Sequence, residues 1–149
     1  MLRPPLAADL EPTVAAVRDG GWGERRPELE FYFRHAQCHP IVAEAYGAIV
    51  GTAMATYSGR VGWLGLVFVT PALRGRGLGA ALTRAALDTL AGFGCRTVLL
   101  AASDLGKPLY DRIGFVVDGA YTVWNDPGAV PRTHTDSSLR RLTAEDVLG

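Results

Sequence analysis

The stretch RGRGLGAAL, residues 74–82, contains the residue types best suited to hold a phosphate group. Two arginines alternate with glycines where an apolar run gives way to helix-forming residues. Glycine lets the backbone approach a ligand closely, and the first turn of a helix offers unpaired N–H groups and the positive end of its dipole. Arg74 and Arg76 can add charge-assisted hydrogen bonds to an anion. We therefore predict a phosphate site at this turn.

The turn has two alternative interpretations. The first is a plain strand-to-helix turn without a ligand, but each glycine weakens a helix start by about 0.5–1 kcal/mol relative to alanine. The second is a dinucleotide site, because GxGxxA at residues 75–80, followed by Asp104 after the next strand, resembles the dinucleotide fingerprint. Residues 70–74 separate that first glycine from its strand, and antiparallel strands are expected before it, so the dinucleotide interpretation is weak.

Hydrophobic periodicity predicts the elements that position this turn. Helices are expected at residues 9–20, 27–36, 78–93 and 107–114, and strands at residues 2–4, 41–46, 49–57, 62–70 and 97–102, with two more within 115–124 around Asp118-Gly119. The strands at 41–70 form an antiparallel meander with turns at Gly47-Ala48 and residues 58–60. The order predicts an α/β domain whose mixed central sheet has about six or seven strands, flanked by about four helices.

Composition limits the classes of function. The chain has 149 residues, 48% hydrophobic and 20% charged, with a formal net charge of +0, which favours one soluble domain and no nucleic-acid or membrane partner. Cys38 and Cys95 lie far apart without a histidine cluster, so neither a disulfide framework nor a metal site is expected. No signal peptide and no apolar run of about 18 residues is visible, so we expect a cytoplasmic protein.

The sequence VFVTPALRGRGLGAAL, residues 67–82, resembles the acetyl-CoA signature of the GNAT superfamily of N-acetyltransferases. The core pattern of that signature, (Arg/Gln)-x-x-Gly-x-(Gly/Ala), is met by Arg74, Gly77 and Gly79. The downstream LYDRIGF at residues 109–115 is also similar, and the resemblance extends from residue 2 to about residue 124. It implies the GNAT fold, acetyl-CoA as cosubstrate, and direct transfer of an acetyl group to a primary amine of a small molecule or protein.

The resemblance also implies which residues hold the cofactor. The backbone of the turn would cradle the pyrophosphate, and the strand before it would pair with the pantetheine arm. Ser103 stands seven residues before Tyr110, where many relatives carry an asparagine, so a cofactor contact at Ser103 departs from the pattern. The predicted cofactor-binding residues are Val67, Phe68, Val69, Arg74, Gly75, Arg76, Gly77, Leu78, Gly79, Ala80 and Ser103.

The family resemblance further implies that Tyr110, in LYDRIGF, is the general acid for the departing thiolate, with a packing tyrosine as the alternative. Many relatives carry a glutamate on the strand before the turn, but VGWLGLVFV at residues 61–69 contains no carboxylate. Glu44 and His35 are available as bases, but a solvated glutamate and a surface histidine are the favoured interpretations of these residues. No base is assigned from the sequence: it comes from elsewhere in the chain, or a chain of water molecules replaces it.

Four aromatic residues are expected to line the acceptor site: Trp22, Trp63, Tyr121 and Trp124. Their presence suggests an acceptor with an apolar or planar portion, while core packing is the alternative explanation. The missing strand carboxylate supports a rival function, a non-catalytic acyl-CoA-binding or sensing domain. The sequence decides neither the acceptor nor the oligomeric state, and a homodimer is compatible with it.

The C-terminal part predicts a change in organisation. Residues 1–126 are expected to form the GNAT domain, and residues 127–138, rich in Pro, Gly, Ser and Thr, a linker. LRRLTAEDV at residues 139–147 aligns with LRPPLAADL at residues 2–10 in the Leu, the Arg, an Ala and the Asp. Residues 139–149 are therefore either an ordinary tail or the start of a second GNAT-like domain, as in a two-domain subgroup of that family.

Overall fold

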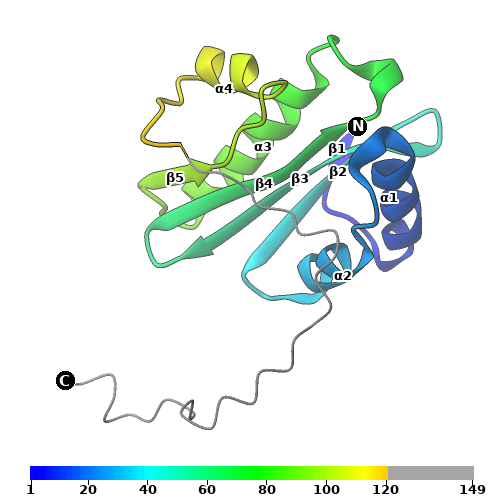
Figure 1. Ribbon diagram of the computed structural model, residues 1–149. Coiled ribbons are helices and arrows are strands. Elements are labelled where there is room, and N and C mark those ends of the chain that lie inside the picture. Colours follow the sequence, from blue (N-terminus) through cyan, green and yellow to red (C-terminus); the bar gives the residue numbers. More distant parts are fainter. Residues whose placement is uncertain (121–149) are drawn as a thin grey trace, which may run out of the picture. The chain divides into compact units, whose positions relative to one another are not determined.

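The structure, a computed structural model, describes residues 1–120, and Met1–Val116 form one compact unit (Figure 1). Its helices are α1 (Leu10–Val17), α2 (Arg26–Arg34), α3 (Leu78–Gly92) and α4 (Lys107–Ile113), with a π-helical segment at Arg18–Trp22 and short 3₁₀ turns at Ala7–Asp9 and Pro71–Leu73. Its strands are β1 (Leu2–Arg3), β2 (Cys38–Ala45), β3 (Ala48–Ser58), β4 (Val61–Val69) and β5 (Thr97–Leu100). The predicted linker and tail, as well as Tyr121 and Trp124, lie outside the described residues.

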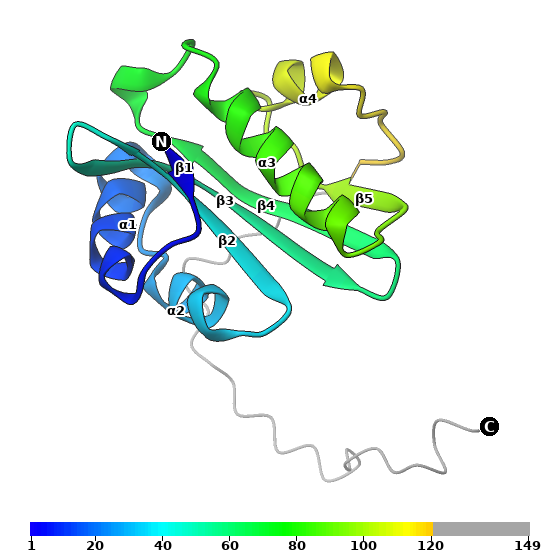
Figure 2. The same ribbon diagram turned by 180° about the vertical axis from the view of Figure 1, so that it is seen from behind.

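The five strands form one sheet in the order β1-β2-β3-β4-β5. Neighbours from β1 to β4 are antiparallel, and β4 pairs with β5 in parallel. Helices α1 and α2 cover one face and α3 the other (Figures 1 and 2). The expected α/β architecture with a mixed sheet and four α-helices is therefore confirmed for the part of the chain that the structure describes.

The strand count is lower than predicted, because residues 115–120 form no strand. A strand exists only when its backbone groups pair with a neighbour, and the second arm of the predicted hairpin lies at residues 121–124, outside the description. The side chains of Val116 and Val117 are 88% and 70% exposed, so these two residues bury no apolar face.

The hairpin between β2 and β3 turns one residue earlier than predicted. Tyr46 and Gly47 carry φ values of 54° and 73°, and Ala48 already pairs with Ala45. Positive φ at both central residues is the geometry of a type I′ turn, whose twist matches that of the strands it joins. The turn is therefore Tyr46-Gly47 and not Gly47-Ala48. The next hairpin turns at Gly59-Arg60, within the expected segment, because Ser58 still pairs with Val61.

Two hydrophobic clusters hold the layers together. On one face, Leu82, Ala86 and Leu90 of α3 are fully buried against the small side chains of Ala53 and Ala55 on β3 and their neighbours. On the other face, α1 and α2 bury Val14, Val17 and Leu29 against Phe68 of β4. Each helix packs an apolar stripe with helical spacing, which explains why the periodicity of the sequence located these helices.

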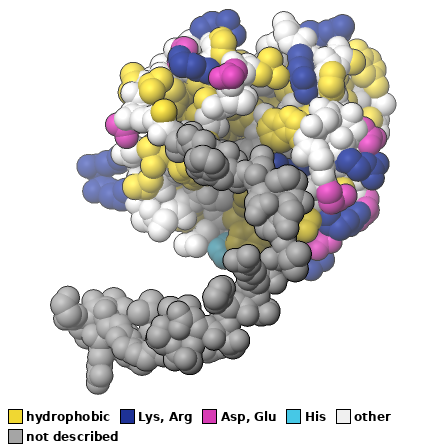
Figure 3. All heavy atoms as spheres, in the orientation of Figure 1, with side chains coloured by type: hydrophobic (Ala, Val, Ile, Leu, Met, Phe, Trp, Pro, Cys, Tyr) yellow, Lys and Arg dark blue, Asp and Glu magenta, His cyan; other side chains and the backbone are white. Residues whose placement is uncertain are grey.

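Charge is spread over the surface. On the face shown in Figure 3, Lys and Arg side chains lie at several separate places around the rim, in line with the balanced net charge. No helix among the described residues is long and apolar enough to cross a membrane.

Candidate active site

A cavity of about 810 Å³ opens where β4 separates from β5. The two strands pair only from Val61↔Thr97 to Leu64↔Leu100. Just beyond, the pairing of β4 with β3 shifts register, and Leu66 takes a φ of 46°. Such a bulge bends the strand and increases its twist. Residues 65–69 line the cavity on the side where β5 no longer pairs with β4.

The glycine-rich turn forms the wall between β4 and α3. Gly75 and Gly77 have φ values of 75° and 83°, a left-handed conformation that glycine adopts without strain. Gly77 caps α3 without a side-chain hydrogen bond, and the N–H of Ala81 is the one that bonds to the Gly77 carbonyl, at 3.0 Å. The N–H groups of residues 78–80 therefore have no partner within the helix, as at any helix start.

Gly79 brings α3 close to α4. A Cβ atom at this position would lie 3.4 Å from Cδ2 of Leu109 and 3.9 Å from Cγ2 of Val69. Both neighbours line the cavity. Any side chain at residue 79 would therefore take space from the cavity itself.

The structure places nearly all of the predicted site residues on this one cavity. The lining includes Tyr110 and the predicted cofactor residues Val67, Phe68, Val69, Arg74, Gly75, Gly77, Gly79, Ala80 and Ser103. The other two lie differently: Arg76 is exposed outside the lining, and Leu78 is half-buried against the core cluster of α3. Arg74 donates from Nε to the carbonyl oxygen of Val69 at 3.0 Å, which ties the turn to the end of β4.

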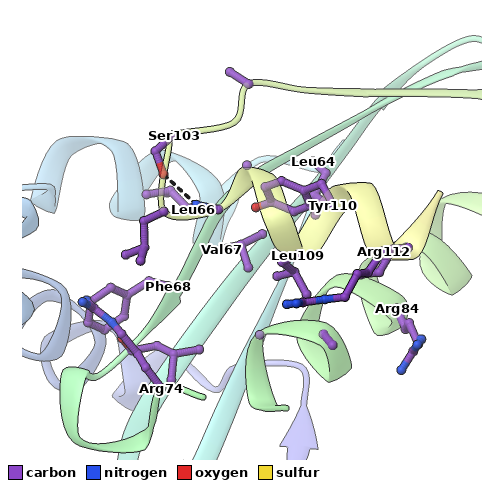
Figure 4. A pocket seen from close by; sticks show the side chains of 18 of the residues that line it. Leu64, Leu66, Val67, Phe68, Arg74, Arg84, Ser103, Leu109, Tyr110 and Arg112 are labelled. Atoms are coloured by element: carbon purple, nitrogen blue, oxygen red, sulfur yellow. Dashed lines mark hydrogen bonds between the residues drawn. The ribbon is translucent and has the colours of Figure 1, made fainter. Parts of the chain in front are cut away.

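Tyr110 enters the cavity from α4 (Figure 4). Burial raises the pKa of its hydroxyl above the ordinary value, because the phenolate loses hydration there. Its ring packs edge-on to Phe115 with centroids 5.9 Å apart. A Cβ atom at Gly106 would lie 3.0 Å from Cε2 of Tyr110, so the absence of a side chain at Gly106 lets the ring settle against the start of α4.

Ser103 holds the loop that leads into α4. Its Oγ accepts a hydrogen bond from the N–H of Gly106 at 3.2 Å, drawn in Figure 4, and its carbonyl oxygen accepts from Lys107 N–H at 2.8 Å. These bonds satisfy backbone donors at the helix start. The hydroxyl proton of Ser103 remains available for donation into the cavity.

Aromatic side chains line the other part of the cavity. Trp22 and Trp63, both predicted, lie in the lining, and Trp22 packs edge-on to Phe68 at 5.5 Å. Tyr32 of α2 joins them and was missed, because its helical spacing indicates only a buried face. Burial raises the pKa of the Tyr32 hydroxyl, so that this side chain stays neutral at physiological pH.

No carboxylate belongs to the lining among residues 1–120. Glu44, considered as a base, instead binds Arg3, with Oε2 2.9 Å from Nη2. Arg3 also contacts Asp9 at 2.6 Å, and together these contacts tie β1 to the start of α1. His35 is exposed at the end of α2, outside the lining. The strand β4 carries no carboxylate, and the rest of the lining among residues 1–120 adds none.

Two further arginines in the lining were missed: Arg84 of α3 and Arg112 of α4. Arg84 follows Gly77 by seven residues, which is about two helical turns. Helical spacing could therefore have placed Arg84 on the same face of α3 as the glycine-rich turn. Arg112 lies within LYDRIGF, but only the packing of α4 on α3 brings it to the same cavity.

Comparisons with known proteins show which fold this chain shares. Among solved structures, the chain is similar to an acetyltransferase from Trypanosoma brucei, with 24% identity, a TM-score of 0.72 and coverage of 84% of this chain and 98% of that one. It is also similar to a predicted acetyltransferase from Clostridium acetobutylicum solved with acetyl-CoA (21% identity, TM-score 0.70, 84% and 95% covered). A third is an aminoglycoside N-acetyltransferase in complex with CoA (20% identity, TM-score 0.70, 85% and 98% covered).

These identities are low, so the likeness shows a shared fold. The family model described as the acetyltransferase (GNAT) family matches residues 9–115, which include the glycine-rich turn, the bulged strand β4 and Tyr110. The chain therefore belongs to the GNAT family of acetyltransferases.

Proposed function

We propose that this chain binds acetyl-CoA in the cavity between β4, α3 and α4 and transfers the acetyl group directly to a primary amine of a small molecule or protein. The observation that carries the proposal is the position of Tyr110 on the same cavity as the glycine-rich turn. One end of the cavity suits phosphates, and the side chain of Tyr110 supplies a proton donor within it. Membership of the family supports acetyl-CoA as the cosubstrate.

The residues present fit the cofactor. The three N–H groups of residues 78–80 that lack helical partners can donate to pyrophosphate oxygens, and the dipole of α3 favours that charge. Gly79 leaves room where a Cβ atom would meet Leu109 and Val69. Arg74 uses Nε to donate to the carbonyl oxygen of Val69. Its two terminal nitrogens, Nη1 and Nη2, therefore remain as donors for the phosphates. On its β5 side, β4 has no partner strand at Val67–Val69 among residues 1–120, so its backbone groups there can pair with the amides of the pantetheine arm.

Transfer needs a proton for the sulfur that leaves. The neutral amine attacks the thioester carbon, the C–S bond breaks, and the thiolate takes the hydroxyl proton of Tyr110. The pKa of this hydroxyl, raised further by burial, lies well above neutral pH, so the hydroxyl carries the proton that it would donate. The tyrosinate then regains a proton from solvent, and the amine gives its own proton to water, because the described lining contains no carboxylate to take it.

The aromatic part of the cavity favours an acceptor with an apolar or planar portion. Trp22, Tyr32 and Trp63 present flat surfaces, with Trp22 37% and Trp63 47% exposed. Exposed rings of this kind gain from stacking against a ligand. We expect Trp22→Ala to raise the acceptor KM about tenfold while the Kd of acetyl-CoA changes little. An unchanged acceptor KM in steady-state assays would remove Trp22 from the acceptor site.

The proposal is tested by calorimetric titration with acetyl-CoA, with NADH as a control, followed by release of free thiol in the presence of an amine panel. In Tyr110→Phe we expect kcat to fall by about 10²-fold, with the Kd of acetyl-CoA within about twofold of the unmodified chain. Tyr57→Phe is the matched control, because Tyr57 stacks on Phe93 at 4.6 Å and is absent from the cavity lining. An unchanged kcat in Tyr110→Phe would reduce Tyr110 to a packing residue.

A second function, a non-catalytic acyl-CoA-binding or sensing domain, is favoured by one observation. The lining at residues 1–120 holds no carboxylate, so the amine has no protein base there. Tight acetyl-CoA binding without thiol release for any amine in the panel, at pH values above the pKa of each amine, would support this second function over the first.

A further inference from the structure

Arg84 and Arg112 are unexplained by the turn and by the acetyl transfer. Both line the cavity, and neither forms an ion pair with any described residue, whereas Lys107 and Asp111 on the same helix as Arg112 pair at 2.7 Å. Guanidinium groups are charged at every physiological pH. Two such groups in a cavity lining that contains no carboxylate among residues 1–120 create a positive potential, which favours the binding of an anion.

The positions of the two arginines follow from the contact between α3 and α4. Gly79 and Leu109 meet where the helices approach. Arg112 lies one turn after Leu109, and Arg84 lies one turn after Ala80, so each side chain extends from the helix face that bounds the cavity. In Figure 4, Arg112 on α4 and Arg84 on α3 lie on one side of the view, whereas Arg74 lies on the opposite side.

We propose that Arg84 and Arg112 bind the third phosphate of coenzyme A, the monoester on its ribose, and that this contact selects CoA over its 3′-dephospho form. The inference rests on the proposed function. The pyrophosphate is matched by the N–H groups of the turn, so the monoester, one ribose ring away, needs separate cations. A phosphate monoester carries close to two negative charges at pH 7 and matches the planar, bidentate donors of arginine.

The test is a calorimetric titration with two ligands, acetyl-CoA and acetyl-3′-dephospho-CoA. The proteins are the unmodified chain, Arg84→Gln, Arg112→Gln and the double variant. Arg96→Gln is the matched control, because Arg96 is exposed, loses the same charge on substitution and is outside the lining. We expect the unmodified chain to prefer acetyl-CoA by about tenfold or more, the range of one charge-assisted contact.

In the double variant this ratio of dissociation constants should fall to about one, because acetyl-CoA alone loses affinity. Arg96→Gln should keep the ratio of the unmodified chain. Equal binding of both ligands by the unmodified chain would overturn the inference and leave the proposed function standing. Equal weakening of both ligands in the variants would also overturn it, since the arginines would then act on another part of the cofactor. Absence of any acetyl-CoA binding would overturn both proposals.

Discussion

Replacing Gly77 or Gly79 with alanine separates the effect of backbone strain from the effect of an added methyl group. At Gly77 a Cβ atom would meet nothing within 4 Å, but the residue holds φ at 83°. At Gly79 φ is not positive, and the Cβ atom would be in ordinary contact with Leu109 at 3.4 Å. The two substitutions add the same methyl group two residues apart, yet they should change the stability of the fold in opposite directions.

The magnitudes follow from conformation. Alanine in the left-handed region costs about 1–2 kcal/mol, so Gly77→Ala should lower the free energy of unfolding by about 1 kcal/mol after the smaller entropy of the unfolded alanine chain is included. Gly79 lies inside α3, where alanine is favoured over glycine by about 0.5–1 kcal/mol. The two variants should therefore differ by about 2 kcal/mol, which is about 4–8 °C in Tm for a chain of this size.

Affinity for acetyl-CoA should fall by about tenfold or more in Gly77→Ala, because strain at this left-handed residue displaces the N–H groups that face the pyrophosphate. It should change little in Gly79→Ala, because the signature accepts alanine at this position. Urea unfolding and calorimetric titration measure the two effects separately. Gly92→Ala is the control: it lies at the end of α3, its Cβ atom would meet nothing, and it should leave the Kd unchanged. A Gly77→Ala variant that binds acetyl-CoA as well as the unmodified chain would refute the assignment of the turn as the pyrophosphate cradle.

Two further predictions concern stability. In Gly20→Ala the new Cβ atom would lie 2.3 Å from Cζ of the buried Phe68, so this overpacking should lower the free energy of unfolding by about 1–3 kcal/mol in urea titrations; no change would show that Phe68 moves aside freely. Hydrogen bonds from Arg3 lower the pKa of Asp9 in the folded state. They therefore stabilise the fold fully at pH values above the pKa of Asp9 in the unfolded chain, about 3.9, and this stabilisation is lost as the pH falls through the lower pKa of the folded state. Asp9→Asn should lower stability at pH 7 and flatten the decline of stability below about pH 4, and parallel acid unfolding of both proteins would contradict this.

The sequence by itself determined the features that depend on neighbours along the chain. The glycine-rich turn, the helix that follows it and the antiparallel meander were predicted because left-handed turns, helix starts and period-two alternation are local patterns. Tyr110 was identified through the resemblance of LYDRIGF to a short family motif, which is likewise a local feature of the sequence. The hairpin at Tyr46-Gly47 was misplaced by one residue, because a tyrosine with positive φ is rare and its local signal points elsewhere.

Only the tertiary structure decided which distant residues meet at the site. The bulge at Leu66 lies where β4 and β5 separate, and the missing side chain of Gly106 leaves room for the ring of Tyr110. Glu44 pairs with Arg3, and neither residue lines the cavity. Arg84 and Arg112 lie on different helices and reach one cavity through the contact of Gly79 with Leu109. These juxtapositions depend on how whole layers pack, and packing is set by the shapes of surfaces assembled from the entire fold, which no local spacing encodes.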